Sequence, residues 1–280
     1  MNDKIVLATI FSFLASLFWI IIVYKIDKHE KEPIPLLLKL FFTSMLLSIV
    51  AGFLNTLNTK LFGEFGTLIF VGLVEEGVKL LAVWIIVFKH KEFNTPIDGV
   101  IYASVSALGF AFMENIEYNY LFFKTVDSQH IDYAITLRAF IPFMHVLISS
   151  IWGYALGMYK LYIFKKQQVI LLFLLSAIVH SVYDITVTIA PVVMTLAFAI
   201  LISIFIFRVS HLNRISNQKV KFFIACPNCN HKIAENSLFC RYCGTKIVLK
   251  PFSTVKLYCR YCYYLVKENW EFCKNCGKKI

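Results

Sequence analysis

Residues 67–88 read TLIFVGLVEEGVKLLAVWIIVF, an apolar run broken only by Glu75, Glu76 and Lys79. Its length matches the roughly 20 residues that a helix needs to cross a bilayer. Charged side chains within a bilayer are costly, so those that occur usually face a cavity or a partner. This stretch therefore predicts a membrane helix that carries part of a polar site.

Similar apolar runs recur along the chain and predict an all-α polytopic membrane bundle of about seven transmembrane helices. Of the 280 residues, 59% are hydrophobic and 16% are charged, against about 25% charged in ordinary soluble proteins. This composition excludes a disordered protein and almost any water-soluble enzyme. The predicted spans are 5–24, 35–57, 67–88, 97–116, 138–159, 168–187 and 190–207.

The charges predict the orientation of these spans. Lysines are concentrated in every second loop, which the positive-inside rule places in the cytoplasm: Lys25, Lys28, Lys31, Lys89, Lys91, Lys160, Lys165 and Lys166. We therefore expect a multi-pass protein of the cell membrane with an external N-terminus and a cytoplasmic C-terminal tail. Because lysines rather than a small-residue cleavage site follow the first span, we expect it to be a retained anchor. The longest external loop is predicted at 117–137.

Ionisable residues in four predicted spans reach the outer half of the membrane. At a rise of about 1.5 Å per residue, Glu75, Glu76, His145 and His180 lie roughly 10–14 Å below the outer edge. Glu114 and Asp184 lie nearer the outer surface, within about 5 Å. Scattered structural charges have little reason to agree in depth. The agreement indicates one shared polar site, although such a cluster can also serve only to hold helices together.

Spacing within each predicted helix supports a shared site. Lys79 falls between Glu75 and Glu76 on the helical wheel, so its ammonium can offset part of their charge. His180 and Asp184 are four residues apart and share a face. We expect Asp184 to hold the His180 ring in one tautomer.

Four motifs follow one another in this region. Residues 74–79 (VEEGVK) contain an EExxK element, residues 110–115 (FAFMEN) an FxxxEN element, and His180 to Asp184 an HxxxD element. Arg138, His145 and the sequence GYALG at 153–157 lie between the last two. Together they resemble the PrsW family of intramembrane proteases, which is distantly similar to the CAAX prenyl endopeptidases. The resemblance covers about residues 67–187.

The resemblance implies a peptide-bond hydrolase, with the catalytic residues drawn from Glu75, Glu76, Glu114, His145, His180 and Asp184. Glu75 would be the general base, and Glu76 a second acid or the partner of Lys79. His145 and His180 would bind a catalytic zinc. Glu114 or Asp184 would be a third ligand or a hydrogen-bond partner of a ligand. A metal-free scheme, with Glu75 activating water and His180 stabilising the oxyanion, fits the same residues. No HExxH motif decides between them.

The implied substrate is a single-span membrane protein cut near the external face, as in the site-1 processing of anti-sigma factors. The rival interpretation is a non-catalytic membrane receptor or scaffold, in which the polar cluster only joins helices. A transporter or channel is less consistent, because neither repeat halves nor broken helices are visible.

The tail contains an internal repeat with a shift of 33 residues. Each copy has two CxxC pairs with the spacing of a tetrahedral zinc site, so we expect two zinc ribbons that depend on metal for their fold. A reducing cytoplasm disfavours disulfides. The predicted ligands are Cys226, Cys229, Cys240 and Cys243 in the first ribbon, and Cys259, Cys262, Cys273 and Cys276 in the second.

We expect a transmembrane protease-like domain at 1–207, a linker at 208–225, a ribbon at 226–248, a linker at 249–257 and a ribbon at 258–280. Residues 208–280 carry fourteen basic and three acidic side chains, so the formal charge of +11 resides in the tail. We interpret this charge as attraction to the anionic inner leaflet of the bilayer, in preference to nucleic acid. The ribbons would regulate the protease or bind a cytoplasmic protein partner.

The orientation is testable with a reporter that is active only outside the cell. Fused after Ile280, it should give no signal, because the lysine-rich loops hold the tail in the cytoplasm. A cytoplasmically active reporter at the same position is the control and should be active. An external signal would contradict both the orientation and the argument against disulfides.

Overall fold

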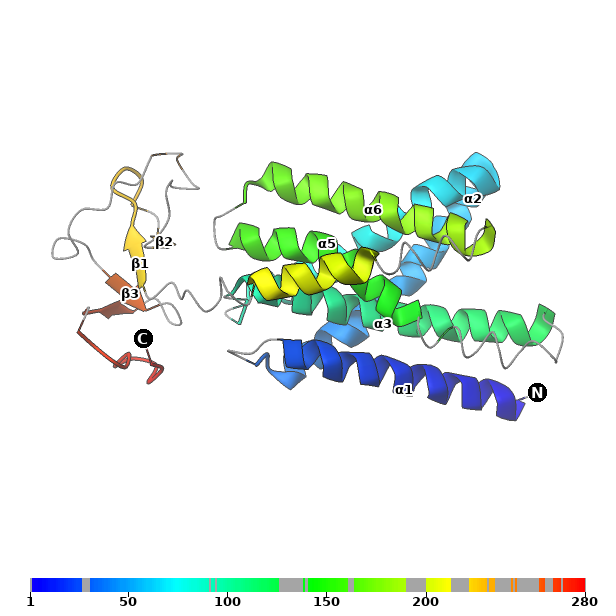
Figure 1. Ribbon diagram of the computed structural model, residues 1–280, viewed down its shortest axis with the longest axis horizontal. Coiled ribbons are helices and arrows are strands. Elements are labelled where there is room, and N and C mark those ends of the chain that lie inside the picture. The colour runs from blue at the N-terminus through cyan, green and yellow to red at the C-terminus, as the bar shows by residue number, and fades with distance from the viewer. Residues whose placement is uncertain are drawn as a thin grey trace.

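The structure is a computed structural model of the 280-residue chain. It describes residues 2–26, 31–90, 92–93, 95–125, 138, 141–160, 164–189, 200–212, 222–230, 232–234, 243, 245, 257–259, 264–267 and 269–279. Figure 1 shows a helical bundle at one end of the molecule and a small β-structure at the other.

The helical part confirms a polytopic membrane bundle. Five stretches of the described residues are long and apolar enough to cross a membrane: Val6–Ile26, Ile34–Glu64, Pro96–Leu121, Ile141–Lys160 and Lys166–Thr186. They belong to the helices α1 (Asn2–Ile26), α2 (Ile34–Ile86), α3 (Pro96–Thr125), α5 (Ile141–Lys160) and α6 (Lys166–Ile189). A shorter apolar helix spans Ile200–Leu212. Helix α1 begins at the end of the bundle that faces away from the tail (Figure 1).

Helix α2 is a hairpin rather than a rod. A straight helix of its 53 residues would be about 80 Å long, far more than the roughly 30 Å hydrocarbon core. Gly63 interrupts it with φ 70° and ψ −179°, a conformation essentially restricted to glycine. Residues on either side then meet, since Thr59 and Thr67 share a hydrogen bond of 2.8 Å and Asn55 contacts Glu75. The two arms correspond to the predicted spans 35–57 and 67–88.

Helices α3 and α5 form the centre of the bundle. Their apolar windows are 89% and 83% buried, against 22–39% for the other spans. Glycines allow close contact between them: a Cβ on Gly99 would lie 2.3 Å from the carbonyl oxygen of Gly153, and one on Gly157 would lie 1.9 Å from that of Pro96. Small residues at such interfaces let membrane helices approach closely. The GYALG sequence therefore serves helix packing.

Several predicted boundaries differ from the structure. Helix α3 continues to Thr125, so the first part of the predicted loop 117–137 is helical and Glu117 is not a loop residue. The last predicted span, 190–207, lies partly outside the described residues, and its described part belongs to Ile200–Leu212. The predicted linker 208–225 begins in that helix and ends in a strand, and Leu257 of the linker 249–257 also lies in a strand. The polarity of the sequence predicted a loop or linker in each of these segments. Backbone hydrogen bonds nevertheless continue the helix or strand into them.

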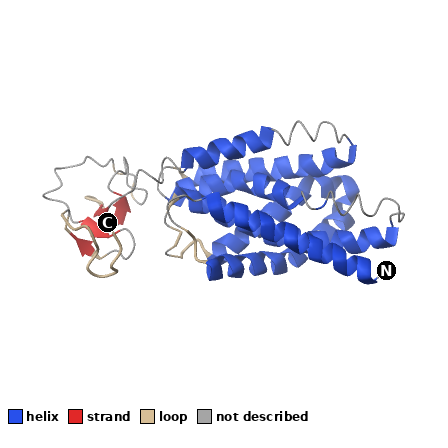
Figure 2. Ribbon diagram, turned by 60° about the horizontal axis from the view of Figure 1, so that its bottom comes forward, coloured by secondary structure: helices blue, strands red, loops and turns tan. Residues whose placement is uncertain are grey.

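The described residues of the tail form a four-stranded antiparallel sheet with the order β2-β1-β3-β4. The strands are β1 (Phe222–Ala225), β2 (Lys232–Ala234), β3 (Leu257–Cys259) and β4 (Leu265–Val266). Figure 2 shows these strands together, apart from the helices. Ile224, Leu257 and Val266 form a small core with buried cysteines.

The two repeats meet in the middle of this sheet. Strand β1 of the first repeat pairs with β3 of the second, and Ile224 lies opposite its own repeat equivalent, Leu257. The pairing therefore has approximate two-fold symmetry. The predicted ribbons share one sheet instead of forming two separate units.

Replacing Gly63 with alanine should destabilise the protein by about 1–3 kcal/mol, because alanine is strained in the Gly63 conformation. Gly52→Ala is the matched control on the same helix, since a Cβ there meets no atom within 4 Å. The control should be neutral or slightly stabilising. Unfolding of purified protein by SDS titration in bicelles measures both effects. Equal stabilities of the two variants would contradict the hairpin geometry.

Candidate functional site

The predicted polar residues of four helices converge in the interior of the bundle. The second arm of α2 contributes Glu75, Glu76 and Lys79, α3 contributes Glu114, α5 contributes His145, and α6 contributes His180 and Asp184. The rings of His145 and His180 lie 5.1 Å apart between centroids. The ionisable residues that the sequence places at similar depths are therefore in direct contact in the structure.

Glu76 is the most enclosed carboxylate of the cluster. Its side chain has no exposed surface, and one oxygen, Oε1, accepts a hydrogen bond of 2.7 Å from the equally buried Lys79. The other oxygen, Oε2, accepts hydrogen bonds of 2.7 Å from Ser149 Oγ and from Trp152 Nε1. A buried carboxylate with this many donors is held in place as an anion. Glu76 is therefore the partner of Lys79, the second of the roles considered from the sequence.

Glu76 also orients His180. His180 Nδ1 lies 2.8 Å from Glu76 Oε1, whereas Asp184 Oδ2 lies 3.9 Å from His180 Nε2. The expectation that Asp184 fixes the His180 tautomer was therefore wrong, because Glu76 is the carboxylate at hydrogen-bonding distance. The four-residue spacing on one helix brought Asp184 near the ring, but only the packing of α2 against α6 puts a carboxylate at hydrogen-bonding distance. With Nδ1 donating to Glu76, Nε2 of His180 is left facing Glu75 at 3.5 Å.

His145 lies between a cation and a carboxylate. Lys79 Nζ is 2.9 Å from His145 Nδ1, and because an ammonium only donates, Nδ1 accepts. Nε2 then carries the proton and lies 2.9 Å from Glu114 Oε2, although the alignment is not that of a hydrogen bond. Glu114 Oε1 is held by Arg138 Nη2 at 3.1 Å.

The site borders a cavity of about 130 Å³. Glu75 and Glu114 reach it from α2 and α3, together with residues of the first arm of α2 and of α3: Ser48, Gly52, Asn55, Phe110, Glu117 and Tyr118. Glu76 does not line it. The neighbouring glutamates thus have different environments, one facing the cavity and the other enclosed among helices.

Three side chains could hold a metal ion. Glu75, His145 and His180 each offer one ligand atom, and these atoms lie within 4.8 Å of one another. Two imidazoles and one carboxylate form a common ligand set of catalytic zinc. The hydrogen bond from His180 Nδ1 to Glu76 is the usual support for a metal-binding histidine. The residues therefore fit a metal ion. Because a ligand nitrogen must be deprotonated, His145 would release its Nε2 proton if that nitrogen bound the metal.

Sequence reasoning missed several residues of the site. Ser149 and Trp152 follow His145 by four and seven residues, so helical spacing could have revealed them as members of the same face. Asn55 donates to Glu75 Oε1 at 3.3 Å. It precedes the motifs and meets them only because α2 folds back at Gly63, so no local pattern signalled it.

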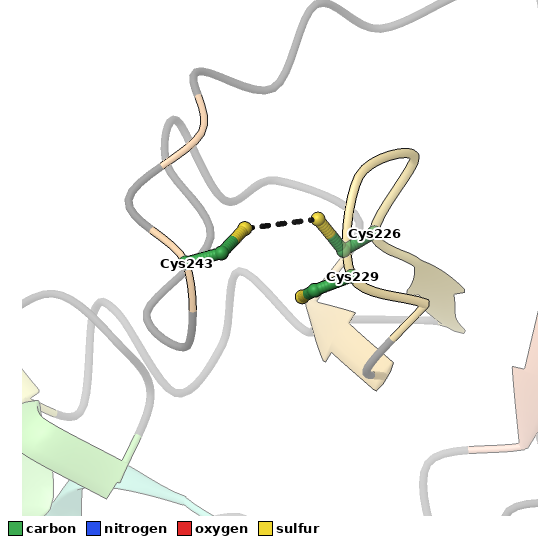
Figure 3. A group of neighbouring side chains, drawn as sticks. All are labelled: Cys226, Cys229 and Cys243. Carbon is green, nitrogen blue, oxygen red and sulfur yellow. Dashed lines mark hydrogen bonds between the residues drawn. The ribbon is translucent and has the colours of Figure 1, made fainter.

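The described cysteines of the tail form two clusters, Cys226 with Cys229 and Cys243, and Cys259 with Cys273 and Cys276. Their predicted fourth members, Cys240 and Cys262, lie outside the described residues. Figure 3 shows the first cluster, in which the sulfurs of Cys226 and Cys243 are 3.7 Å apart. The sulfurs of Cys259 and Cys276 are 3.8 Å apart.

These sulfur separations match a zinc site. Tetrahedral zinc with bonds of about 2.3 Å keeps two sulfurs about 3.8 Å apart. Hydrogen bonding by Thr245 lowers the pKa of the Cys243 thiol to about 5, which favours the thiolate that binds metal. The described thiols of each cluster are therefore close enough together to bind one metal ion.

Comparisons with protein families match both parts of the chain. Residues 32–210 match the model of the PrsW family intramembrane metalloprotease, and residues 226–277 match the double zinc ribbon. No solved structure matches the chain.

Several bacterial proteins named Protease PrsW are similar to this chain. The protein of Clostridioides difficile is 32% identical over 196 residues, which are 66% of this chain and 79% of that protein. The protein of Oceanobacillus iheyensis is 32% identical over 167 residues, 58% of this chain and 74% of the relative. That of Geobacillus kaustophilus is 31% identical over 167 residues, 58% and 71% of the two chains.

The two adjacent glutamates should differ in their effect on stability. Glu76→Ala should cost about 3–5 kcal/mol of unfolding free energy, because it leaves the Lys79 ammonium buried without its carboxylate. Glu75→Gln, at the cavity, should change stability by less than about 1 kcal/mol. SDS titration of the purified proteins measures both.

The double variant Glu76→Ala/Lys79→Met tests the cause. It should recover more than half of the loss, because no uncompensated buried charge remains. Equal losses for the Glu75 and Glu76 variants, or no recovery in the double variant, would show that the enclosed pair does not stabilise the bundle.

Proposed function

The chain belongs to the PrsW family of intramembrane metalloproteases, and we propose that it hydrolyses a peptide bond of a single-span membrane protein at the site around Glu75, His145 and His180. The observation that carries this proposal is the convergence of one carboxylate and two imidazoles within 4.8 Å beside a cavity. In a scaffold whose polar residues only join helices, these groups would need no open space beside them.

Glu75, His145 and His180 would hold the metal. A metal bound there supplies Lewis-acid polarisation of the scissile carbonyl and favours ionisation of water. Glu76 fixes the His180 ring through Nδ1, so Nε2 faces Glu75. Assigning Glu75 as a ligand differs from the general-base role that the family resemblance implies, and the proximity of its carboxylate to both imidazoles supports the change.

We assign the proton transfers to Glu114. Its Oε2 is buried and lies 2.9 Å from His145 Nε2 without the alignment of a hydrogen bond, while Arg138 holds Oε1 and so fixes the orientation of the carboxylate. As the water oxygen bonds to the carbonyl carbon, Oε2 accepts a proton from the water. It then returns the proton to the amide nitrogen as the C–N bond breaks, releasing a carboxylic acid and an amine.

The substrate is proposed to enter from the membrane and to be cut near the external face. The orientation given by the lysine-rich loops puts the site in the outer half of the bilayer. Glu117 and Tyr118 line the cavity toward the end of α3, which lies outside in this orientation. Site-1 processing of a membrane-anchored regulatory protein is a reaction of this kind.

The tail is proposed to lie against the anionic inner leaflet, where it regulates the protease or binds a cytoplasmic protein. The second ribbon exposes Tyr264, Leu265 and Phe272 beside exposed lysines, among them Lys267 and Lys274. Exposed apolar side chains near basic ones suit an anionic lipid surface. They suit a nucleic acid less well, because proteins that bind single strands stack the bases on a platform of aromatic side chains.

Reconstituted protein should cleave a single-span substrate, and Glu75→Gln or His180→Ala should lower kcat/KM at least about 1,000-fold, because each removes a group at the reacting centre. Lys60→Gln, a charge change remote from the site on the first arm of α2, is the control and should cleave normally. Metal analysis separates the roles of Glu75. Wild type should contain about three zinc ions per chain and the glutamine variant about two.

Other outcomes are informative. If Glu75→Gln loses activity but keeps its metal, Glu75 is the general base, and Glu114 or Asp184 becomes the third ligand. If wild type contains only the two tail ions and remains active, the metal-free scheme applies. If the variants cleave as well as wild type, the proposed site is wrong.

A further inference from the structure

The cavity beside Glu75 has one wall that none of the four motifs supplies. Ser48, Gly52 and Asn55 lie on the first arm of α2, and their spacing of four and three residues places them on one face of the helix. The opposite wall is α3. Glu75 lies between the walls, so any chain that occupies the cavity passes directly beside the proposed site.

The orientation of the Asn55 amide follows from its contact with Glu75. Asn55 Nδ2 donates a hydrogen bond of 3.3 Å to Glu75 Oε1, and an amide nitrogen can only donate. The amide nitrogen faces Glu75, and the amide oxygen Oδ1 points away from it. Oδ1 is buried and has no hydrogen-bond partner among the described residues.

A second acceptor, the Glu114 carboxylate, lines the same cavity. Glu114 Oε2 is buried and lies 2.9 Å from His145 Nε2 without the alignment of a hydrogen bond, and this oxygen already has a proposed role toward water. Two nearby donors are engaged elsewhere: Arg138 bonds Glu114 Oε1 and Asn115, and Ser48 bonds the carbonyl of Met45. The cavity therefore presents acceptors and suits a ligand that brings donors.

A membrane substrate brings such donors when it is cut. Within a bilayer, helical segments pair each backbone N–H internally, because no water is present to satisfy it. Residues around a scissile bond must leave the helix before catalytic groups can reach the carbonyl, and this frees their N–H groups in an apolar environment. Acceptors in the cleft are then needed to compensate for the lost helical hydrogen bonds.

We propose that Asn55 is a substrate-binding residue whose Oδ1 accepts a hydrogen bond from one backbone N–H of the unwound substrate segment. The inference rests on the proposed function and identifies how that site recognises its substrate. Recognition through the backbone accepts different side chains at this position. A substrate is then selected by how readily its membrane segment unwinds near the outer face.

The test combines one enzyme variant with one backbone change in the substrate. The probe is a synthetic single-span peptide of about 25 residues, with a Gly-Gly pair in the outer half of its apolar segment. A series of peptides replaces the amides around this pair, one at a time, by esters, which removes a single N–H. Cleavage by the full chain in nanodiscs gives kcat/KM, and binding is measured with the His180→Ala protein.

In wild type, one ester position should lower kcat/KM and binding about tenfold, as expected when a buried acceptor loses its donor. Asn55→Leu, which keeps the side-chain size and removes the acceptor, should lower both about tenfold for the all-amide peptide. In this variant the same ester should cost less than about twofold, because the partner is already absent. Thr56→Val is the matched control, because the exposed Thr56 hydroxyl donates to the carbonyl of Gly52, and it should show the wild-type ester profile.

Comparing wild type and Asn55→Leu on the amide and ester peptides forms a cycle, which separates substrate recognition by Asn55 from a role in positioning Glu75 or in binding a cation. If Asn55 only positions Glu75, the ester penalty will be the same in Asn55→Leu and wild type, and the proposal is overturned. If Asn55→Leu instead lowers the metal content and leaves the ester profile unchanged, the cavity binds a cation and the proposal is also overturned. Should the leucine variant not fold, Asn55→Ala carries the same comparison.

Failure of the proposed function gives a different result. In that case wild type cleaves no peptide of the series, but the binding cycle in the His180→Ala protein still decides whether Asn55 recognises a backbone N–H. Coupling between Asn55 and one ester position in binding supports the inference without turnover, and additive effects contradict it.

Discussion

A carboxylate and an ammonium enclosed together in an apolar bundle impose the constraint on which the rest of the structure depends. Neither Glu76 nor Lys79 has exposed surface, so each must be paired and hydrogen-bonded within the protein. Glu76 meets this need with donors from three helices: Lys79 on α2, Ser149 and Trp152 on α5, and His180 on α6. The arrangement of these helices is therefore tied to one buried anion.

The same constraint gives two adjacent residues different roles: Glu76 stabilises the bundle, and Glu75 belongs to the proposed reaction site. Adjacent positions on a helix differ by about 100° in direction, so Glu76 points among the helices while Glu75 points to the cavity. The enclosed glutamate orients His180, and the cavity glutamate shares the space in front of both imidazoles. A reactive group placed in the interior needs such a fixed neighbour, because a membrane offers no water to satisfy misplaced polar atoms.

The tail solves a different problem with different means. Its strands are two to four residues long and its core is three aliphatic side chains with buried cysteines, which is too little to stabilise a fold without metal. Joining the repeats through β1 and β3 gives both cysteine clusters a common sheet.

The sequence by itself determined the helical class, most of the span positions, the ionisable residues of the polar site and the cysteine pattern of the tail. These follow from composition, from periodicity and from the cost of charge in a bilayer, all of which act locally along the chain. Only the tertiary structure decided that Glu76 rather than Asp184 orients His180, that Asn55 meets Glu75, and that the two repeats share one sheet. Each of these contacts joins residues whose distance in space is set by how helices or strands pack after a turn in the chain. Helical spacing specifies which residues share a face, but it carries no information about the face that packs against it.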